Sequence, residues 1–146
     1  MDNGENNSQI KLTRSEEREQ AFMLLFSSMF DNEPLDEKIE DDTQLFEGGV
    51  CGYAQSVVSG IDDKKEELDL EISEFLKKGW SISRISKSSL AILRLAIYEI
   101  KYIESIPESV SINEAVELAK KYTIDESKFV NGILGAYVRS KAEGTK

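Results

Sequence analysis

The stretch "KFVNGILGAYVRSK", residues Lys128 to Lys141, decides whether the end of the chain folds as a helix or as a β-hairpin. Its Asn-Gly pair lies between apolar residues, which is a strong local signal for a hairpin turn. The apolar residues, however, recur as adjacent pairs every four positions, and these pairs are Phe129-Val130, Ile133-Leu134 and Tyr137-Val138. Such spacing forms one stripe on a helix and none on a strand. The stretch therefore predicts a helix.

This helix would contain Gly132 in its interior, where glycine costs about 1 kcal/mol relative to alanine. We expect a compensating feature, and a close approach of another backbone is the usual one. The adjacent Asn131 can offer its side-chain amide either to a neighbouring loop or to a ligand.

Length and composition indicate one compact helical domain. The chain has 146 residues, 40% of them hydrophobic, and only two prolines, which favours helices over strands or disorder. No stretch reaches the roughly 18 apolar residues that span a bilayer. The N-terminal residues "MDNGENNSQ" have no signal-peptide core. We therefore expect a cytoplasmic protein that does not enter a membrane.

The scarcity of cysteine and the absence of histidine argue against an enzyme. The chain has one cysteine, Cys51, and no histidine, so the commonest general base and the commonest metal ligand are both missing. Catalysis by a nucleophile and a histidine is excluded. We expect no catalytic site, no cofactor and no metal.

Charge is distributed unevenly along the sequence. The formal net charge is −10, but residues 1–75 carry a balance of −14 and residues 76–146 a balance of +4. An acidic protein is a poor nucleic-acid binder on average, since phosphate binding relies on Lys and Arg. The basic second half leaves room for one local anion-binding surface, although solvated helix faces explain the pattern as well.

The first half of the chain predicts a tail followed by helices. Residues 1–12 are polar and without periodicity, and Thr13-Arg14-Ser15-Glu16 fits a capping box that starts a helix over about 13–31. The acidic segment 35–47 predicts a weak second helix. We expect one domain over residues 13–141 and a disordered tail over 142–146.

The segment Ser88 to Ile103 is apolar nearly all round, which predicts a central helix covered on several sides. Arg94 is its exception, and a buried charge must be paired. Glu114 and Glu117 are the leading candidates for a structural ion pair with it. Before this helix, the residues Trp80, Ile82 and Ile85 are expected to be anchored in the core.

Pro107 ends the central helix because it lacks a backbone donor. The following Ser111-Ile112-Asn113-Glu114 offers a second capping box. Counting along the chain gives about seven helices and no credible strand pair, so the fold class is all-α.

Three blocks together resemble the NusB family. They are "REQAFMLLF" at 18–26, "AILRLAIYEIKYIESIPESVSINEAVELAKKY" at 91–122 and "SKFVNGILGAYV" at 127–138. They follow one another in the family's order and cover most of the chain. The resemblance implies an all-helical fold of two packed three-helix bundles. It also implies a bacterial transcription antitermination factor that binds single-stranded boxA RNA of ribosomal RNA leaders together with NusE, a small-subunit ribosomal protein.

The resemblance further implies partners and residues. The partners are the transcription elongation complex and its other Nus factors, and a homodimer is also left open because some relatives dimerise. An arginine-rich N-terminus contributes to RNA binding in the family, and Lys11, Arg14 and Arg18 stand at matching positions here. Arg14 and Arg18 are four residues apart on a helix, so we expect the three cations to line one phosphate track.

The second expected RNA contact is "KKYTIDESKF", residues 120–129. Single-stranded RNA is held by bases stacked on aromatic rings while cations follow the backbone. The expected RNA-binding residues in and just after this stretch are Lys120, Lys121, Tyr122, Lys128, Phe129 and Asn131. Asp125 in the same turn would repel phosphate, and core packing is the competing explanation for the two aromatics.

The sequence allows a comparison with two other functions. A helical protein-interaction module without significant RNA binding fits the acidic composition. A NusB-like accessory domain of a ribosomal RNA cytosine methyltransferase does not fit, because the sequence has no G-x-G-x-x-G pattern and no room for a cofactor-binding α/β domain.

Overall fold

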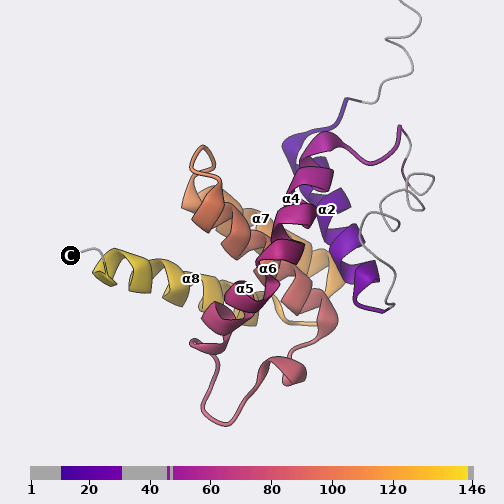
Figure 1. The fold of residues 1–146 in the computed structure, drawn as a ribbon. Coiled ribbons are helices and arrows are strands. Elements are labelled where there is room, and N and C mark those ends of the chain that lie inside the picture. The colour runs from indigo at the N-terminus through magenta and orange to yellow at the C-terminus, as the bar shows by residue number, and fades with distance from the viewer. Residues whose placement is uncertain (1–10, 31–45, 47, 145–146) are drawn as a thin grey trace, which may run out of the picture. The chain divides into compact units, whose positions relative to one another are not determined.

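The computed structural model describes residues 11–30, 46 and 48–144, and all regular elements in these ranges are helical (Figure 1). The all-α prediction is confirmed. The elements are α2 (Arg14–Ser28), α4 (Gly52–Asp63), α5 (Lys65–Ser73), the 3₁₀ helix η2 (Ile82–Arg84), α6 (Lys87–Tyr102), α7 (Glu108–Tyr122) and α8 (Ser127–Gly144).

The chain divides into two compact units, residues 1–59 and residues 60–146. Two units agree with the two bundles that the family resemblance implies. The weak helix predicted over 35–47 and most of the predicted N-terminal tail lie outside the described residues. At the other end, α8 continues to Gly144, past the predicted domain end at residue 141.

In the first unit, the predicted capping box at the start of α2 is confirmed. The Glu16 backbone N–H donates to Thr13 Oγ1 at 3.1 Å, and the Thr13 N–H donates to Glu16 Oε1 at 2.8 Å. Phe22 and Leu24 on the same helix are each 1% exposed. The Gln20 side chain accepts a 2.9 Å hydrogen bond from the Cys51 N–H, so it ties α2 to the residue just before α4.

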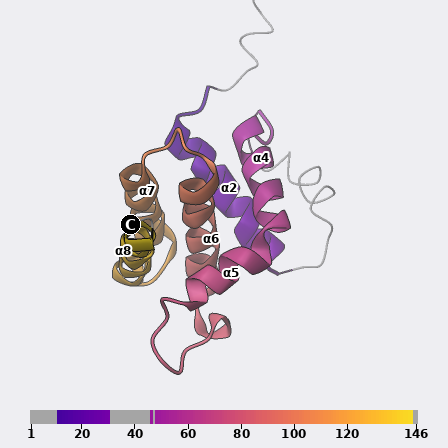
Figure 2. The same cartoon turned by 60° about the vertical axis from the view of Figure 1, so that its left-hand side comes forward.

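In the second unit, α6 is the central helix, as its sequence predicted. It contacts α5, α7 and α8, and in Figure 2 α7 and α8 lie on one side of it while α5 crosses its lower end. Ten of its residues are buried, among them Ile92, Leu93 and Ile97 at 0% exposed. In the described part of the chain, no helix combines the length and hydropathy that crossing a bilayer requires.

Arg94 on α6 is paired with a carboxylate, as predicted, but the partner is Asp69 on α5. Its Nε and Nη2 donate to the two Asp69 oxygens, each at 2.8 Å. The prediction of Glu114 or Glu117 was wrong because it placed the partner on α7, whereas the guanidinium of Arg94 faces α5. The two parallel bonds hold α5 against α6 with fixed geometry.

Ser111 also differs from its prediction. It does not cap a helix, because α7 already begins at Glu108 with Pro107 before it. Instead its hydroxyl donates a 2.8 Å hydrogen bond to Glu99 Oε1 on α6, and both residues are 1% exposed. A polar pair in the core thus connects α6 with α7, because a buried carboxylate needs a donor.

We expect Arg94→Ala to lower the free energy of unfolding by about 2 kcal/mol. Breaking a fully buried ion pair costs roughly 3–5 kcal/mol, and this pair is partly hydrated because its side chains are 13% and 25% exposed. Urea unfolding measures the change. Lys65→Ala is the control, since Lys65 makes an exposed 4.0 Å pair with Asp62 and should change stability by less than about 0.5 kcal/mol. An equally small loss for Arg94→Ala would contradict the role of this pair.

Tyr137 on α8 makes stability depend on pH in the alkaline range. Burial, followed by the charge of Glu71, raises the pKa of its phenol to about 12, against about 10 in an unfolded chain. Between these two values the folded state binds more protons than the unfolded state, so its stability falls as pH rises.

The Tyr137→Phe variant should therefore lose less stability than the parent between about pH 9.5 and pH 11.5. Unfolding free energies at both pH values test this. Other groups that titrate in this range are present in both proteins, so the difference isolates Tyr137. Parallel losses would show that its phenol ionises normally.

Candidate functional site

A cavity of about 330 Å³ opens between the segment after α5 and the first turns of α8. It lies within the second unit and is mainly apolar. Its size is at the lower end of ligand sites, which are roughly 300–1,000 Å³. The lining residues are Phe75, Lys77 and Trp80 from the segment, and Lys128, Phe129, Gly132 and Ile133 from α8.

A tight turn places Trp80 at this cavity. The Trp80 N–H donates to the Lys77 carbonyl at 2.9 Å, and Gly79 has φ +88°. A positive φ at the third position of a four-residue turn favours glycine. The prediction that Trp80 is anchored in the core was wrong, because the turn leaves its side chain 47% exposed. Ile85, 7% exposed, is the residue that anchors the segment.

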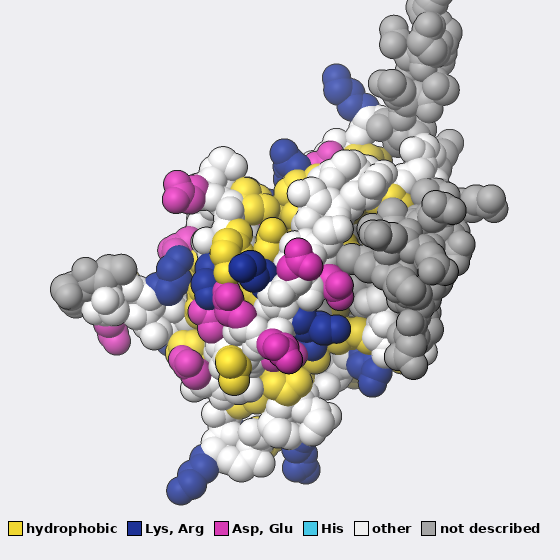
Figure 3. Space-filling view, viewed as in Figure 1, with side chains coloured by type: hydrophobic (Ala, Val, Ile, Leu, Met, Phe, Trp, Pro, Cys, Tyr) yellow, Lys and Arg dark blue, Asp and Glu magenta, His cyan; other side chains and the backbone are white. Residues whose placement is uncertain are grey.

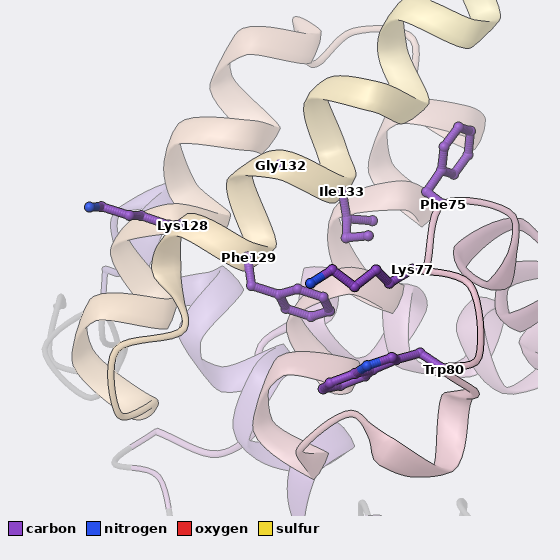
Figure 4. Close-up of a pocket in the computed structure, with 7 residues that line it drawn as sticks. All are labelled: Phe75, Lys77, Trp80, Lys128, Phe129, Gly132 and Ile133. Carbon is purple, nitrogen blue, oxygen red and sulfur yellow. The ribbon is translucent and has the colours of Figure 1, made fainter.

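Aromatic and cationic groups surround the cavity. Figure 4 shows the rings of Phe129 and Trp80 directed into the same space, with the Lys77 side chain extending beside Phe129 and Lys128 pointing outward. The Arg84 guanidinium carbon lies 5.5 Å from the centroid of the Trp80 ring. Two flat apolar surfaces with cations around them suit a ligand that is planar in one part and anionic in another, such as a nucleotide of a single strand.

No other backbone lies close to Gly132, in contrast to the expectation from the sequence. A Cβ built on it would meet no atom within 4 Å, so no other backbone approaches it and that expectation was wrong. Gly132 instead forms part of the cavity wall. The missing side chain keeps the cavity open.

The other residues expected to bind RNA in the second unit lie outside this lining. Lys120 pairs with Glu117 at 3.4 Å, both largely exposed, and Lys121 Nζ lies 5.5 Å from the Tyr122 ring centroid. Asn131 is exposed on α8. The structure thus places Lys128 and Phe129 at the cavity. Lys120 and Lys121 of α7 are exposed and lie outside the cavity lining.

In the first unit, the three expected cations do not form one exposed row. Lys11 is exposed. Arg14 is exposed too, but it donates to Glu17 at 2.7 Å and its guanidinium lies 4.5 Å from the Tyr53 ring centroid. Arg18 is only 3% exposed. The expectation that Arg18 lines a phosphate track is corrected, because a buried guanidinium does not reach a ligand at the surface.

Charges on the face drawn in Figure 3 are interspersed, with Lys and Arg side chains next to Asp and Glu. No continuous cationic surface is seen on this face. Local clusters such as the one at the cavity therefore decide where an anion can bind.

Sequence reasoning missed Lys77, Trp80 and Arg84. A tryptophan followed by Ile82 and Ile85 suggests a core residue, because large aromatic residues usually pack there. The signal that could have found it is "KKGW", residues 77–80, where two lysines and a glycine turn precede an aromatic residue. Such a turn tends to lie at the surface.

Comparison with known proteins agrees with the fold. The model of the NusB family matches residues 15–139. The transcription antitermination protein NusB of Lacticaseibacillus casei is 42% identical over 124 residues, which cover 84% of this chain and 92% of that protein. The protein of the same name from Clostridium novyi is 41% identical over 135 residues, covering 88% of this chain and all of that one.

Solved structures give the same result. NusB of T. maritima superposes with a TM-score of 0.80 at 34% identity, covering 89% of this chain and 93% of that chain. The crystal structure of the antitermination factors NusB and NusE in complex with dsRNA contains a chain that matches with a TM-score of 0.76 at 27% identity, covering 87% of this chain and 96% of that one. The chain described here belongs to the NusB family.

Proposed function

We propose that this chain is a transcription antitermination factor that binds boxA RNA of ribosomal RNA leader transcripts together with the ribosomal protein NusE. Relatives that match most of the chain are named transcription antitermination proteins, and a similar chain was crystallised with NusE and dsRNA. The observation that carries RNA binding is the cavity, which Trp80, Phe129, Lys77 and Lys128 line.

The cavity favours an unpaired base over a duplex. In an A-form helix the base faces are stacked on one another, so they are not free to stack on Phe129 or Trp80. A base of a single strand can be splayed out and inserted between aromatic side chains. We therefore propose a single-stranded boxA segment as the ligand of this cavity, with Lys77, Lys128 and Arg84 near its phosphates.

Only a few cations, Lys77, Lys128 and Arg84, lie at the cavity in the described part of the chain, and this supports the need for a protein partner. Few phosphate contacts give weak binding that falls steeply with salt. A basic ribosomal protein such as NusE would be attracted by the net charge of −10 and would add cations of its own. We propose that the complex acts in the cytoplasm within the elongation complex and its other Nus factors, and that a homodimer would compete with it.

The alternative function is a helical protein-interaction module without RNA binding. The interspersed charges of Figure 3 favour it, because acidic side chains beside the cations weaken the attraction for phosphate. RNA binding separates the two functions directly.

The test uses Trp80, which is the only tryptophan of the chain. Single-stranded boxA RNA added to the protein should change its tryptophan emission, and the same sequence as a duplex should change it much less. Labelled boxA RNA, followed by anisotropy with and without NusE, then measures affinity in the complex. If neither RNA form binds in either condition, the interaction-module function replaces the proposed one.

The variant Gly132→Ala should have opposite effects on stability and on RNA binding. Alanine improves helix propensity, so unfolding should cost about 0.5–1 kcal/mol more, and no neighbour obstructs the added methyl group. The same methyl group narrows the cavity and should weaken boxA binding. Thermal melting and RNA anisotropy measure the two effects.

Gly144→Ala is the matched control for this variant, because Gly144 lies at the end of the same helix and has no neighbour within 4 Å. It should leave RNA binding unchanged. A Gly132→Ala protein that binds RNA as tightly as the parent would remove the cavity from the RNA site.

A further inference from the structure

Glu126, the residue immediately before α8, is bonded to the start of α6. Its Oε1 accepts hydrogen bonds from the hydroxyls of Ser86, at 2.6 Å, and Ser89. Ser86 is the residue that caps α6, since its Oγ also accepts from the Ser89 N–H at 3.2 Å. Ser89 is 0% exposed. We call Ser86, Ser89 and Glu126 the Glu126 cluster.

The backbone around Glu126 is fixed as well. The Glu126 N–H donates to Thr123 Oγ1 at 3.2 Å, and that hydroxyl donates to the Ala119 carbonyl at 2.6 Å. Asp125 adopts a left-handed conformation with φ 59°, which is uncommon for a residue with a side chain. The Val130 N–H bonds to the Glu126 carbonyl at 3.0 Å. Glu126 thus sets where and how α8 begins.

The cluster joins the two segments that form the cavity. The segment with Trp80 ends at Ser86, six residues later, and Phe129 lies three residues after Glu126, in the first turn of α8. In the described ranges, no hydrogen bond joins Phe75, Lys77 or Trp80 to a lining residue of α8. The start of the segment packs on α8 through the rings of Phe75 and Tyr137, whose centroids are 6.2 Å apart. The other end of the segment is held by the Glu126 cluster.

We propose that the Glu126 cluster positions the two walls of the cavity for RNA, so that Ser86, Ser89 and Glu126 are positioning residues of the RNA site without touching RNA. This inference rests on the proposed function. Its physical basis is pre-organisation, because a site whose walls are already held in place loses less conformational entropy on binding.

The proposal predicts that removing the Glu126 side chain weakens RNA binding, whereas electrostatic repulsion alone predicts tighter binding. Removing a carboxylate from the neighbourhood of an RNA site should tighten binding, since the carboxylate repels phosphate. The Glu126→Ala variant removes both the charge and the acceptor of the two serine hydroxyls. We expect it to bind boxA RNA roughly two- to tenfold more weakly.

The variant Glu126→Gln separates charge from position, because the amide oxygen still accepts from both hydroxyls while the charge is lost. It should bind RNA at least as tightly as the parent. Glu104→Ala is the control for net charge, since Glu104 is exposed and lies beyond the other end of α6. It should bind like the parent or slightly more tightly.

A second measurement follows the cavity without RNA. The steady-state anisotropy of Trp80 emission should fall in Glu126→Ala and remain at the parent value in Glu126→Gln, because the freed segment rotates faster. Ser89→Ala, which loses one of the two hydroxyl donors, should give a smaller fall and serves if Glu126→Ala does not fold. Thermal melting followed by circular dichroism shows which variants are folded.

The outcomes decide separately on the two proposals. If Glu126→Ala binds RNA as tightly as the parent or more tightly, or if Glu126→Gln is as weak as Glu126→Ala, the positioning role is overturned. If the parent binds no RNA at all, the proposed function fails. The Trp80 anisotropy then still decides the positioning role, and equal values in the parent and Glu126→Ala would overturn it.

Discussion

The burial of α6 is the constraint on which the second unit depends. A helix with Ile92, Leu93 and Ile97 fully buried must be covered on several sides, and α5, α7 and α8 supply that cover. Covering α6 brings the segment after α5 next to the start of α8, although these parts are far apart in the sequence. The cavity with Trp80 and Phe129 is a consequence of this packing. Polar bonds from α6 then fix each neighbour in position, with Arg94 holding Asp69, Glu99 holding Ser111 and the serines of its first turn holding Glu126.

Local patterns predicted the helices well because the apolar residues of this chain recur every three to four positions, as they do on one face of a helix. In α8 the four-residue repeat of apolar residues predicted the helix correctly despite the Asn-Gly pair. The Thr13 capping box was confirmed by its two hydrogen bonds. Predictions failed where the answer depended on which helices meet. The predicted partner of Arg94 lies on α7 whereas the observed one lies on α5, and the predicted cap residue Ser111 lies inside α7. Residue spacing gives the face of a helix but not the neighbour that covers the face.

The candidate site was only half predictable for the same reason. Lys128 and Phe129 belong to a recognisable block, so the family resemblance found them. Lys77, Trp80 and Arg84 come from a segment whose apolar residues looked like core, and only the turn at Gly79 brings Trp80 to the surface. Arg18 shows the reverse error, since a cation in a matching position turned out to be buried. A net charge of −10 is therefore compatible with RNA binding, because a few cations gathered around two aromatic rings matter more than the average.

The central claim is that an unpaired base stacks in the cavity while cations contribute the salt-dependent part of binding. The most direct test is the salt dependence of boxA binding by the parent, Phe129→Ala and Lys128→Ala in the presence of NusE. The claim predicts that Phe129→Ala loses about 1–3 kcal/mol of binding with an unchanged slope of log K against log salt. It predicts that Lys128→Ala makes the slope shallower by about 0.7. Unchanged affinity in Phe129→Ala, in a protein that is folded and still binds NusE, would contradict it.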